Sequence, residues 1–209
     1  MSSDVSLRPL GLIARLQIQR TPLTFGERPH RYYDPAPLLS VDELTLTPHG
    51  ALVRLAEGGT LLDIHHAHHP QTRNDGGTNA LSVGFTAHYA AIRARYGDDL
   101  ADGCAGENIL VETETMVDLN MLARGLAIQP AGGGSPAWLQ GFQVARPCHP
   151  FSGYVRHGTE AKATKETLQF LDHGLRGFYC GLAEGVVTVA VGDQVLVPPG
   201  PSQLELPLR

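Results

Sequence analysis

The sequence predicts a mainly β fold, a β-barrel with a few peripheral α-helices. Many short apolar segments are separated by turn-forming residues, and only two segments carry a convincing helical pattern. The 24 glycines and 15 prolines suit short strands joined by turns. Because helices are so few, the alternating strand–helix units of a doubly wound sheet are not expected, and a barrel fits better.

The predicted strands follow one another along the chain with turns between them. Residues 10–19 come first, because apolar residues alternate from Leu12 to Ile18 and share one face of an extended segment. Residues 20–37, rich in proline and aromatic residues, are expected to form a loop, and residues 130–136 are expected to form a hairpin tip. Further strands are expected at residues 38–46, 51–55, 60–64, 80–85, 107–111, 126–129, 138–145, 177–182, 186–191 and 194–197.

Two helices are expected, each preceded by a capping residue and followed by a glycine. The first covers residues 86–96, with Thr86 as its N-cap, and the second covers residues 159–173, with Thr159 as its N-cap. Residues 116–124 are expected to hold a helical turn. Without internal repeats or an evident linker, the chain is predicted to be one domain over residues 1–209, with a core at about 10–197 and a proline-rich tail at 198–209.

The composition argues against several classes of partner. The chain carries 16 basic and 21 acidic residues, a formal charge of −5, and no long basic run, so a nucleic-acid partner is not expected. No apolar run reaches the length of a membrane span, and the first residues lack the pattern of a signal peptide. Three cysteines without framework spacing predict reduced thiols and a cytoplasmic location.

One cysteine stands in a sequence that favours reactivity. Cys148 lies between Pro147 and Pro150, next to His149 and two residues after Arg146. Prolines stiffen the backbone, and nearby positive charge favours the thiolate, which is the nucleophile and metal ligand. We therefore interpret Cys148 as the candidate catalytic residue, with Arg146 and His149 stabilising its thiolate. Packing in a core is the simpler role of most free cysteines, and it remains the alternative.

A run of histidines forms the second candidate site. Residues 65–69 contain four of the ten histidines, and on a strand His66 and His68 would point one way while His65 points the other. A His-x-His pair is a start for a zinc site, but nothing in the sequence selects a third ligand. A polar edge that binds no metal explains the run more simply, and a pocket for an anion or an oxo group is a further interpretation. The candidate third ligands are Asp63, Asp75, His88 and His149.

Two further segments combine glycine with polar residues. Glu107 and Asn108 follow a glycine at the start of a predicted strand, where they either line a site or tie down their own loop. Arg176 precedes another strand, where it either holds an anion or is simply solvated. The remaining cysteines, Cys104 and Cys180, are interpreted as packing residues.

The order of these segments resembles the MOSC domain, which is also found at the C-terminus of molybdenum cofactor sulfurases. The resemblance rests on Gly106-Glu107-Asn108 opening a strand, Arg146-Pro147-Cys148 about forty residues later, and Leu175-Arg176-Gly177-Phe178-Tyr179 after a helix. It covers roughly residues 10–197. It implies a β-barrel and a role in handling sulfur or the molybdenum cofactor through the matching cysteine, Cys148.

The resemblance also implies cofactors and partners. Cys148 would carry a persulfide or ligate molybdenum, the metal of molybdopterin. Arg176, His65, His66 and His68 would face the pterin phosphate or oxo groups, with Glu107 and Asn108 bracing the pocket. The partners implied are a cysteine desulfurase and a molybdoenzyme, and any pyridoxal phosphate would belong to the desulfurase. The alternatives are a zinc-dependent hydrolase using the histidines of 65–69 and a non-catalytic docking domain in which Cys148 is buried.

Overall fold

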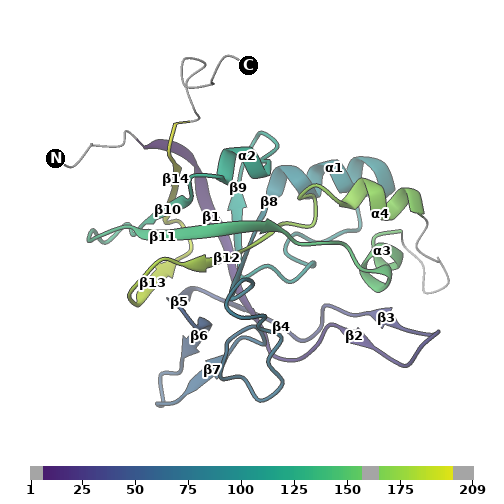
Figure 1. Ribbon diagram of the computed structural model, residues 1–209, viewed down its shortest axis with the longest axis horizontal. Coiled ribbons are helices and arrows are strands. Elements are labelled where there is room, and N and C mark those ends of the chain that lie inside the picture. The colour runs from purple at the N-terminus through teal and green to yellow at the C-terminus, as the bar shows by residue number, and fades with distance from the viewer. Residues whose placement is uncertain (1–6, 157–164, 200–209) are drawn as a thin grey trace.

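A closed barrel organises the computed structural model, which describes residues 7–156 and 165–199. Around the barrel the order of strands is β1, β14, β10, β11, β12, β8 and β9, and β9 pairs again with β1. The predicted fold class, a β-barrel with peripheral helices, is confirmed (Figure 1). The barrel strands are β1 (Arg8–Gln19), β8 (Leu81–Phe85), β9 (Ile109–Glu112), β10 (Leu126–Gln129), β11 (Ala137–Val144), β12 (Phe178–Leu182) and β14 (Gln194–Val197).

Strand β1 closes the barrel because it pairs with strands on both of its sides. Its beginning pairs with β14, its middle with β9 and its end with β4, all antiparallel. The strand bends at two register shifts, one of them next to Gly11. A β-carbon added at Gly11 would stand 1.9 Å from the Glu112 carbonyl oxygen, so only glycine permits this approach of two strands.

A smaller sheet and a hairpin complete the β structure of the described residues. The order β13–β5–β6–β7 forms a separate four-stranded sheet below the barrel in Figure 1. The segment 20–37, predicted as a loop, contains two short strands that pair as a hairpin. The strands of the small sheet and the hairpin are β2 (Thr24–Phe25), β3 (Tyr32–Tyr33), β5 (Glu43–Thr47), β6 (Gly50–Arg54), β7 (Thr60–Leu62) and β13 (Val187–Ala190). Strand β4 (Leu38–Val41) extends the barrel sheet at the end of β1.

The described helices are α1 (Thr86–Tyr96), α2 (Leu119–Leu122), α3 (His149–Tyr154) and α4 (Lys165–Leu171). The first connects β8 to β9, the parallel pair in the barrel, because parallel neighbours require a crossover. Its predicted N-cap is wrong: Phe85 is the cap residue, and the Thr86 hydroxyl instead donates to the Thr113 carbonyl at 3.2 Å. Helix α4 agrees with the second predicted helix, whose predicted cap Thr159 lies outside the described residues.

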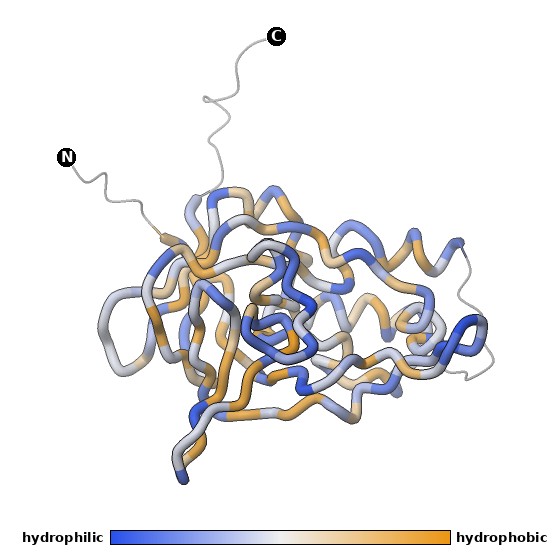
Figure 2. The backbone as a smooth tube through the Cα atoms, turned by 60° about the horizontal axis from the view of Figure 1, so that its bottom comes forward, coloured by the Kyte–Doolittle hydropathy of each residue, from blue (hydrophilic) through white to orange (hydrophobic). Residues whose placement is uncertain are grey.

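Two clusters of buried apolar side chains hold these layers together. The larger fills the barrel and includes Leu16, Val83 and Phe178, each fully buried. The second lies beneath α1 and α3 and includes Tyr89 and Phe151. Figure 2 shows hydrophobic stretches through the middle of the molecule and hydrophilic stretches at several loop tips. The polar cavity described below is lined by members of both clusters, Phe178 from the larger and Tyr33 from the second.

One predicted element has a different structure. The strand predicted at 60–64 ends at Leu62, and residues 65–69 form turns instead of continuing as a strand. Backbone bonds within the segment explain the turns, because His66 N donates to the Asp63 carbonyl and His69 N donates to the His66 carbonyl, both at 2.9 Å. The alternation of the histidines expected on a strand therefore does not apply.

Candidate functional site

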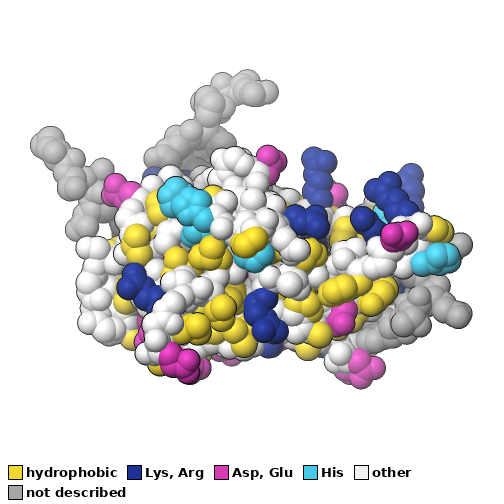
Figure 3. Space-filling model, turned by 90° about the horizontal axis from the view of Figure 1, so that it is seen from below, with side chains coloured by type: hydrophobic (Ala, Val, Ile, Leu, Met, Phe, Trp, Pro, Cys, Tyr) yellow, Lys and Arg dark blue, Asp and Glu magenta, His cyan; other side chains and the backbone are white. Residues whose placement is uncertain are grey.

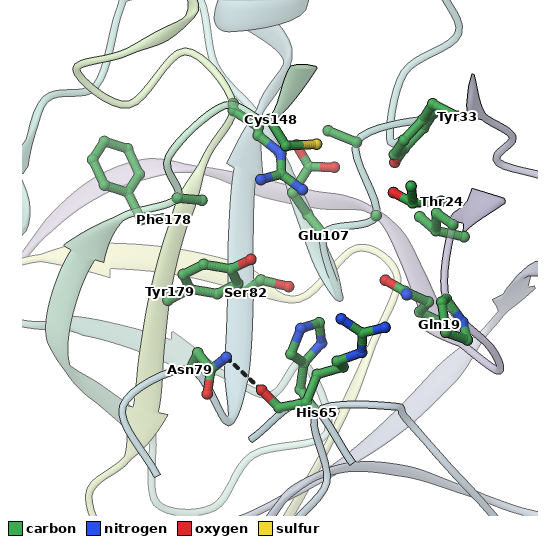
Figure 4. A pocket seen from close by; sticks show the side chains of 17 residues that line it. Gln19, Thr24, Tyr33, His65, Asn79, Ser82, Glu107, Cys148, Phe178 and Tyr179 are labelled. Atoms are coloured by element: carbon green, nitrogen blue, oxygen red, sulfur yellow. Dashed lines mark hydrogen bonds between the residues drawn. The ribbon is translucent and has the colours of Figure 1, made fainter. Parts of the chain in front are cut away.

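A polar cavity of about 290 Å³ lies where the barrel meets the turn 63–79, the β2–β3 hairpin and α3. Its volume is at the lower end of the range for small-molecule sites. Figure 4 shows Cys148 and Glu107 on one side, His65 on the opposite side, and Ser82 and Tyr179 between them. The polar lining includes Gln19, Tyr33, His65, Arg73, Glu107, Cys148, Arg176 and Tyr179.

Cys148 enters the cavity from the N-cap of α3. Its extended backbone (φ −105°, ψ 156°) places it just outside the helix, and Pro150 occupies a favourable position in the first turn. The carbonyl of Cys148 accepts the first helical hydrogen bond, from Ser152 N at 2.9 Å. Its thiol is partly exposed, whereas Cys104 and Cys180 are buried, and burial raises the pKa of both of those thiols. Cys148 is therefore the accessible thiol of the three.

Arg176 reaches the cavity from the turn before β12. Its Nη1 donates to the Arg146 carbonyl at 2.6 Å, and its guanidinium carbon lies 5.4 Å from the centre of the Phe151 ring. Its Nε is buried and, within residues 7–156 and 165–199, has no hydrogen-bond partner. Burial opposes the charge, but the nearby Tyr179, Cys148, Tyr33 and Glu107 side chains outweigh it and raise the pKa of Arg176. Arg176 is therefore a cation in the cavity lining, and its Nε–H group makes no hydrogen bond to the described residues.

Glu107 lines the same side of the cavity and is buried. The Tyr89 hydroxyl lies 2.9 and 2.8 Å from its two carboxyl oxygens and donates to them. Burial raises the pKa of Glu107 to about 7, although the Tyr89 hydrogen bond and Arg176 favour its ionised form. Space for the carboxyl depends on Gly84, because a β-carbon there would stand 2.6 Å from Glu107 Oε1.

Asn108 lies behind the cavity wall and joins three elements. Its Oδ1 accepts from Ser82 N and Ser82 Oγ, at 3.0 and 3.1 Å, and its Nδ2 donates to Asp63 Oδ2 at 3.0 Å. Ser82 lies on β8 and lines the cavity, and Asp63 begins the turn 63–79, which borders the cavity. Asn108 therefore braces the wall, whereas Glu107 is in the lining itself.

The structure separates the histidines that the sequence places together. His65 lines the cavity, with its ring centre 5.8 Å from that of Tyr179. His66 and His68 lie with His49, a residue from the turn between β5 and β6, at ring-centre distances of 4.9 to 6.2 Å. Figure 3 shows one group of histidine side chains at the upper left of the lower face and further histidines apart from it.

No three-ligand metal site accompanies this histidine group. Within the part of the chain that the structure describes, no set of three or more His, Cys, Asp or Glu side chains is arranged to hold a metal ion. His66 Nδ1 accepts a hydrogen bond from His68 N at 3.2 Å, so in its neutral form the ring carries its proton on Nε2. Burial, followed by His68 and His49, lowers the pKa of His66 and favours that neutral form.

The other predicted site residues lie outside the cavity lining. Arg146 and His149 both have exposed side chains, and the backbone carbonyl of Arg146 is the part that meets the site, as the acceptor for Arg176. The lining also contains Arg73, Tyr33 and Tyr179, which the sequence did not single out. Arg73 follows the histidine run in a polar loop. Its backbone is held by two hydrogen bonds, from Arg73 N to the Ile64 carbonyl at 2.8 Å and from Asn79 Nδ2 to the Arg73 carbonyl at 2.9 Å.

Fold and site together define a β-barrel protein with a thiol, two arginines and an imidazole around one small cavity. A family model for the MOSC domain matches residues 65–196, and the chain belongs to the MOSC domain family. This domain is linked to molybdenum cofactor sulfurases. The matched segment contains Cys148, Glu107, Arg176 and His65.

Solved structures show the same fold. The YuaD protein from Bacillus subtilis is 16% identical, with a TM-score of 0.56, and the alignment covers 92% of this chain and 98% of that one. A structure described as a hypothetical protein is 14% identical, with a TM-score of 0.51 over 96% of this chain and 72% of that one. No curated protein sequence matches this chain. Among the described residues, no helix has both the length and the apolar composition needed to cross a membrane.

Proposed function

We propose that this protein binds the molybdenum cofactor, with the Cys148 thiolate as a ligand of molybdenum. The single observation that carries the proposal is that the one accessible thiol of the chain lines a polar cavity beside the Arg176 guanidinium. Thiolate is a soft ligand suited to such metals, and membership of the MOSC family points to the same cofactor. A role in service of a molybdoenzyme follows from this proposal.

The donor set of the cavity fits such a ligand. Arg176 and Arg73 both line the cavity, so two guanidinium groups are available for the phosphate or oxo groups. When bound, the cofactor would supply redox chemistry at the metal. The chain would contribute the thiolate of Cys148, charge balance from Arg176, and walls fixed by Asn108 and Asp63.

Substitution of Cys148 tests this proposal. We expect molybdenum to co-purify with the wild-type chain expressed in a cofactor-producing host and to be lost in Cys148→Ser, as measured by elemental mass spectrometry. The matched control is Cys180→Ala, which removes a fully buried thiol that is not part of the cavity lining, and should keep its molybdenum if it folds. Equal molybdenum in the wild type and in folded Cys148→Ser would refute the proposal.

A second candidate is that Cys148 carries sulfur as a persulfide delivered by a partner cysteine desulfurase, whose pyridoxal phosphate stays on the partner. The partial exposure of Cys148 at the start of a short helix favours it, because a carrier thiol must reach its donor. Incubation with a desulfurase and free cysteine should add one sulfur atom to the wild type but none to Cys148→Ser, as read by intact-protein mass spectrometry.

Alkylation separates both candidates from a docking domain in which Cys148 only packs. We expect iodoacetamide to label Cys148 in the native protein, whereas Cys104 and Cys180 should react only after unfolding, since both are buried. Peptide mapping by mass spectrometry identifies the labelled residue. Labelling of Cys148 only in denaturant would favour the docking role.

A further inference from the structure

A buried carboxylate connects the histidine turn to the barrel. The Asp63 side chain is fully buried, and four nitrogen atoms lie within hydrogen-bond distance of its two oxygens. Oδ2 accepts from Gln19 N at 2.7 Å and Asn108 Nδ2 at 3.0 Å, and Oδ1 lies 2.8 Å from His65 N and 3.2 Å from His65 Nδ1. An ionised carboxylate only accepts hydrogen bonds, so these four partners all have to be donors.

The contact with Asp63 determines where the His65 ring carries its proton. Because Oδ1 of Asp63 can only accept, His65 Nδ1 has to be protonated to make this hydrogen bond. A neutral imidazole has a single ring proton, so the other nitrogen, Nε2, is left with a free lone pair. The same arrangement of carboxylate and imidazole orients histidines in many functional sites.

The neighbouring histidines should have the opposite tautomer. His66 Nδ1 accepts from His68 N at 3.2 Å, and His69 Nδ1 accepts from Gln71 N at 3.0 Å. In their neutral forms these two rings therefore carry the proton on Nε2. Within one short run, only His65 has its Nδ1 directed at a carboxylate and its ring in the cavity.

We propose that His65 presents an unprotonated Nε2 to the cavity and accepts a hydrogen bond from an N–H or O–H group of the bound ligand, with Asp63 as its positioning residue. The ring points into the cavity from the side opposite Cys148 (Figure 4). The lining groups then have different roles, because the Arg73 and Arg176 side chains offer only donors, which suit anionic groups, whereas His65 suits a heterocyclic N–H. The proposal that this N–H belongs to a pterin ring rests on the proposed function above. The tautomer of His65 does not depend on that function.

Nitrogen NMR of the full chain tests this assignment. Protein labelled with ¹⁵N-histidine is studied at about pH 8, where an imidazole is ordinarily neutral. We expect Nδ1 of His65 at the shift of a protonated nitrogen and Nε2 at that of an unprotonated one, with the reverse pattern for His66 and His69. The variants His65→Gln, His66→Gln and His69→Gln assign the three spin systems, each by the loss of its own signals.

The neighbouring histidines are the internal control, and the wild-type spectrum alone decides the tautomer. A protonated Nε2 on neutral His65 would overturn the proposal. In Asp63→Asn, circular dichroism first establishes whether the variant folds; if it does, we expect His65 to become a mixture of tautomers. A folded variant with an unchanged His65 pattern would overturn the positioning role of Asp63.

Pterin serves as the probe for the ligand contact. Its binding to the wild type is followed by fluorescence, and the His65 Nε2 signal is followed in the same titration. We expect that signal to move on binding, and we expect His65→Leu to weaken binding about tenfold, the size of one hydrogen bond. Binding that leaves the His65 signal unmoved overturns the contact. A complete lack of pterin binding, together with the expected tautomer, counts against the proposed function and not against the assignment of His65.

Discussion

At the scale of single residues, burial decides which groups of the site are charged. The negative charge of Glu107 is supported by its own backbone N–H, by the Tyr89 hydroxyl and by Arg176, and burial outweighs all three. Tyr89 is itself fully enclosed, and burial followed by Glu107 raises the pKa of its hydroxyl well above the usual value. Its single proton is therefore kept and is available to the carboxyl. The Tyr89–Glu107 contact holds this acid in place beside Cys148.

This environment predicts a pH-dependent stability. The pKa of Glu107 rises from an ordinary 4.5 to about 7 in the folded chain, so its stabilising contribution is complete below about pH 4.5 and is lost as the pH rises through about 7. Relative to Glu107→Gln, the free energy of unfolding of the wild type should fall by on the order of 3 kcal/mol between those limits. Urea unfolding at about pH 5 and about pH 8 measures it. A difference between the two chains that stays constant with pH would contradict this assignment.

At the scale of the elements, the cavity exists because short strands and turns bring polar residues to one place. The turn 174–177 and strand β8 approach Glu107 from two directions, and each uses a glycine where it does so. Gly177 has a positive φ of 101°, and a β-carbon there would stand 2.8 Å from the Val83 carbonyl oxygen. Gly84 leaves room for the Glu107 carboxyl. Both the turn and the strand therefore need glycine at these positions, because a β-carbon would collide with a neighbouring atom.

A single methyl group at Gly84 tests that statement. In Gly84→Ala the new β-carbon would meet the carboxyl of Glu107 at 2.6 Å, so we expect a loss of about 1–3 kcal/mol, the usual cost of overpacking a buried site. Gly132→Ala is the matched control, because no atom lies within 4 Å of its added β-carbon, and it should change stability by no more than about 0.5 kcal/mol. Thermal unfolding followed by circular dichroism compares the two. Equal stability of both variants would show that the Glu107 carboxyl can move aside.

At the scale of the whole molecule, closure of the barrel joins the two ends of the described chain. Strand β14 pairs with β1 on one side and with β10 on the other, so it completes the ring near the end of the sequence. The side chains Val195 and Val197 are fully buried in the larger cluster. The same β1 strand leads directly to Gln19, whose backbone N–H holds Asp63. Closure of the barrel thus positions β1, whose last residue, Gln19, holds Asp63 next to the cavity.

Truncation measures the importance of closure. A chain lacking residues 194–209 has no β14, which leaves β1 and β10 with open edges, and we expect it to lose cooperative thermal unfolding and protection of the amides of β1 from hydrogen exchange. A chain lacking only residues 200–209 keeps β14 and should unfold like the full chain. Cooperative unfolding of the shorter chain would show that β14 is dispensable.

The sequence by itself determined most of the strands, the barrel class and the family, because alternation of apolar residues, turn-forming residues and the order of short motifs are local properties of the chain. It also singled out Cys148, since the two prolines and the absence of a comparable setting at Cys104 and Cys180 can be read from neighbouring residues. Local patterns cannot say which distant residues meet. Only the tertiary structure placed Arg176 beside Cys148, brought Arg73 into the lining, and separated His65 from His66 and His68, because turns rather than a strand follow Leu62 and one buried carboxylate, Asp63, fixes the direction of that turn.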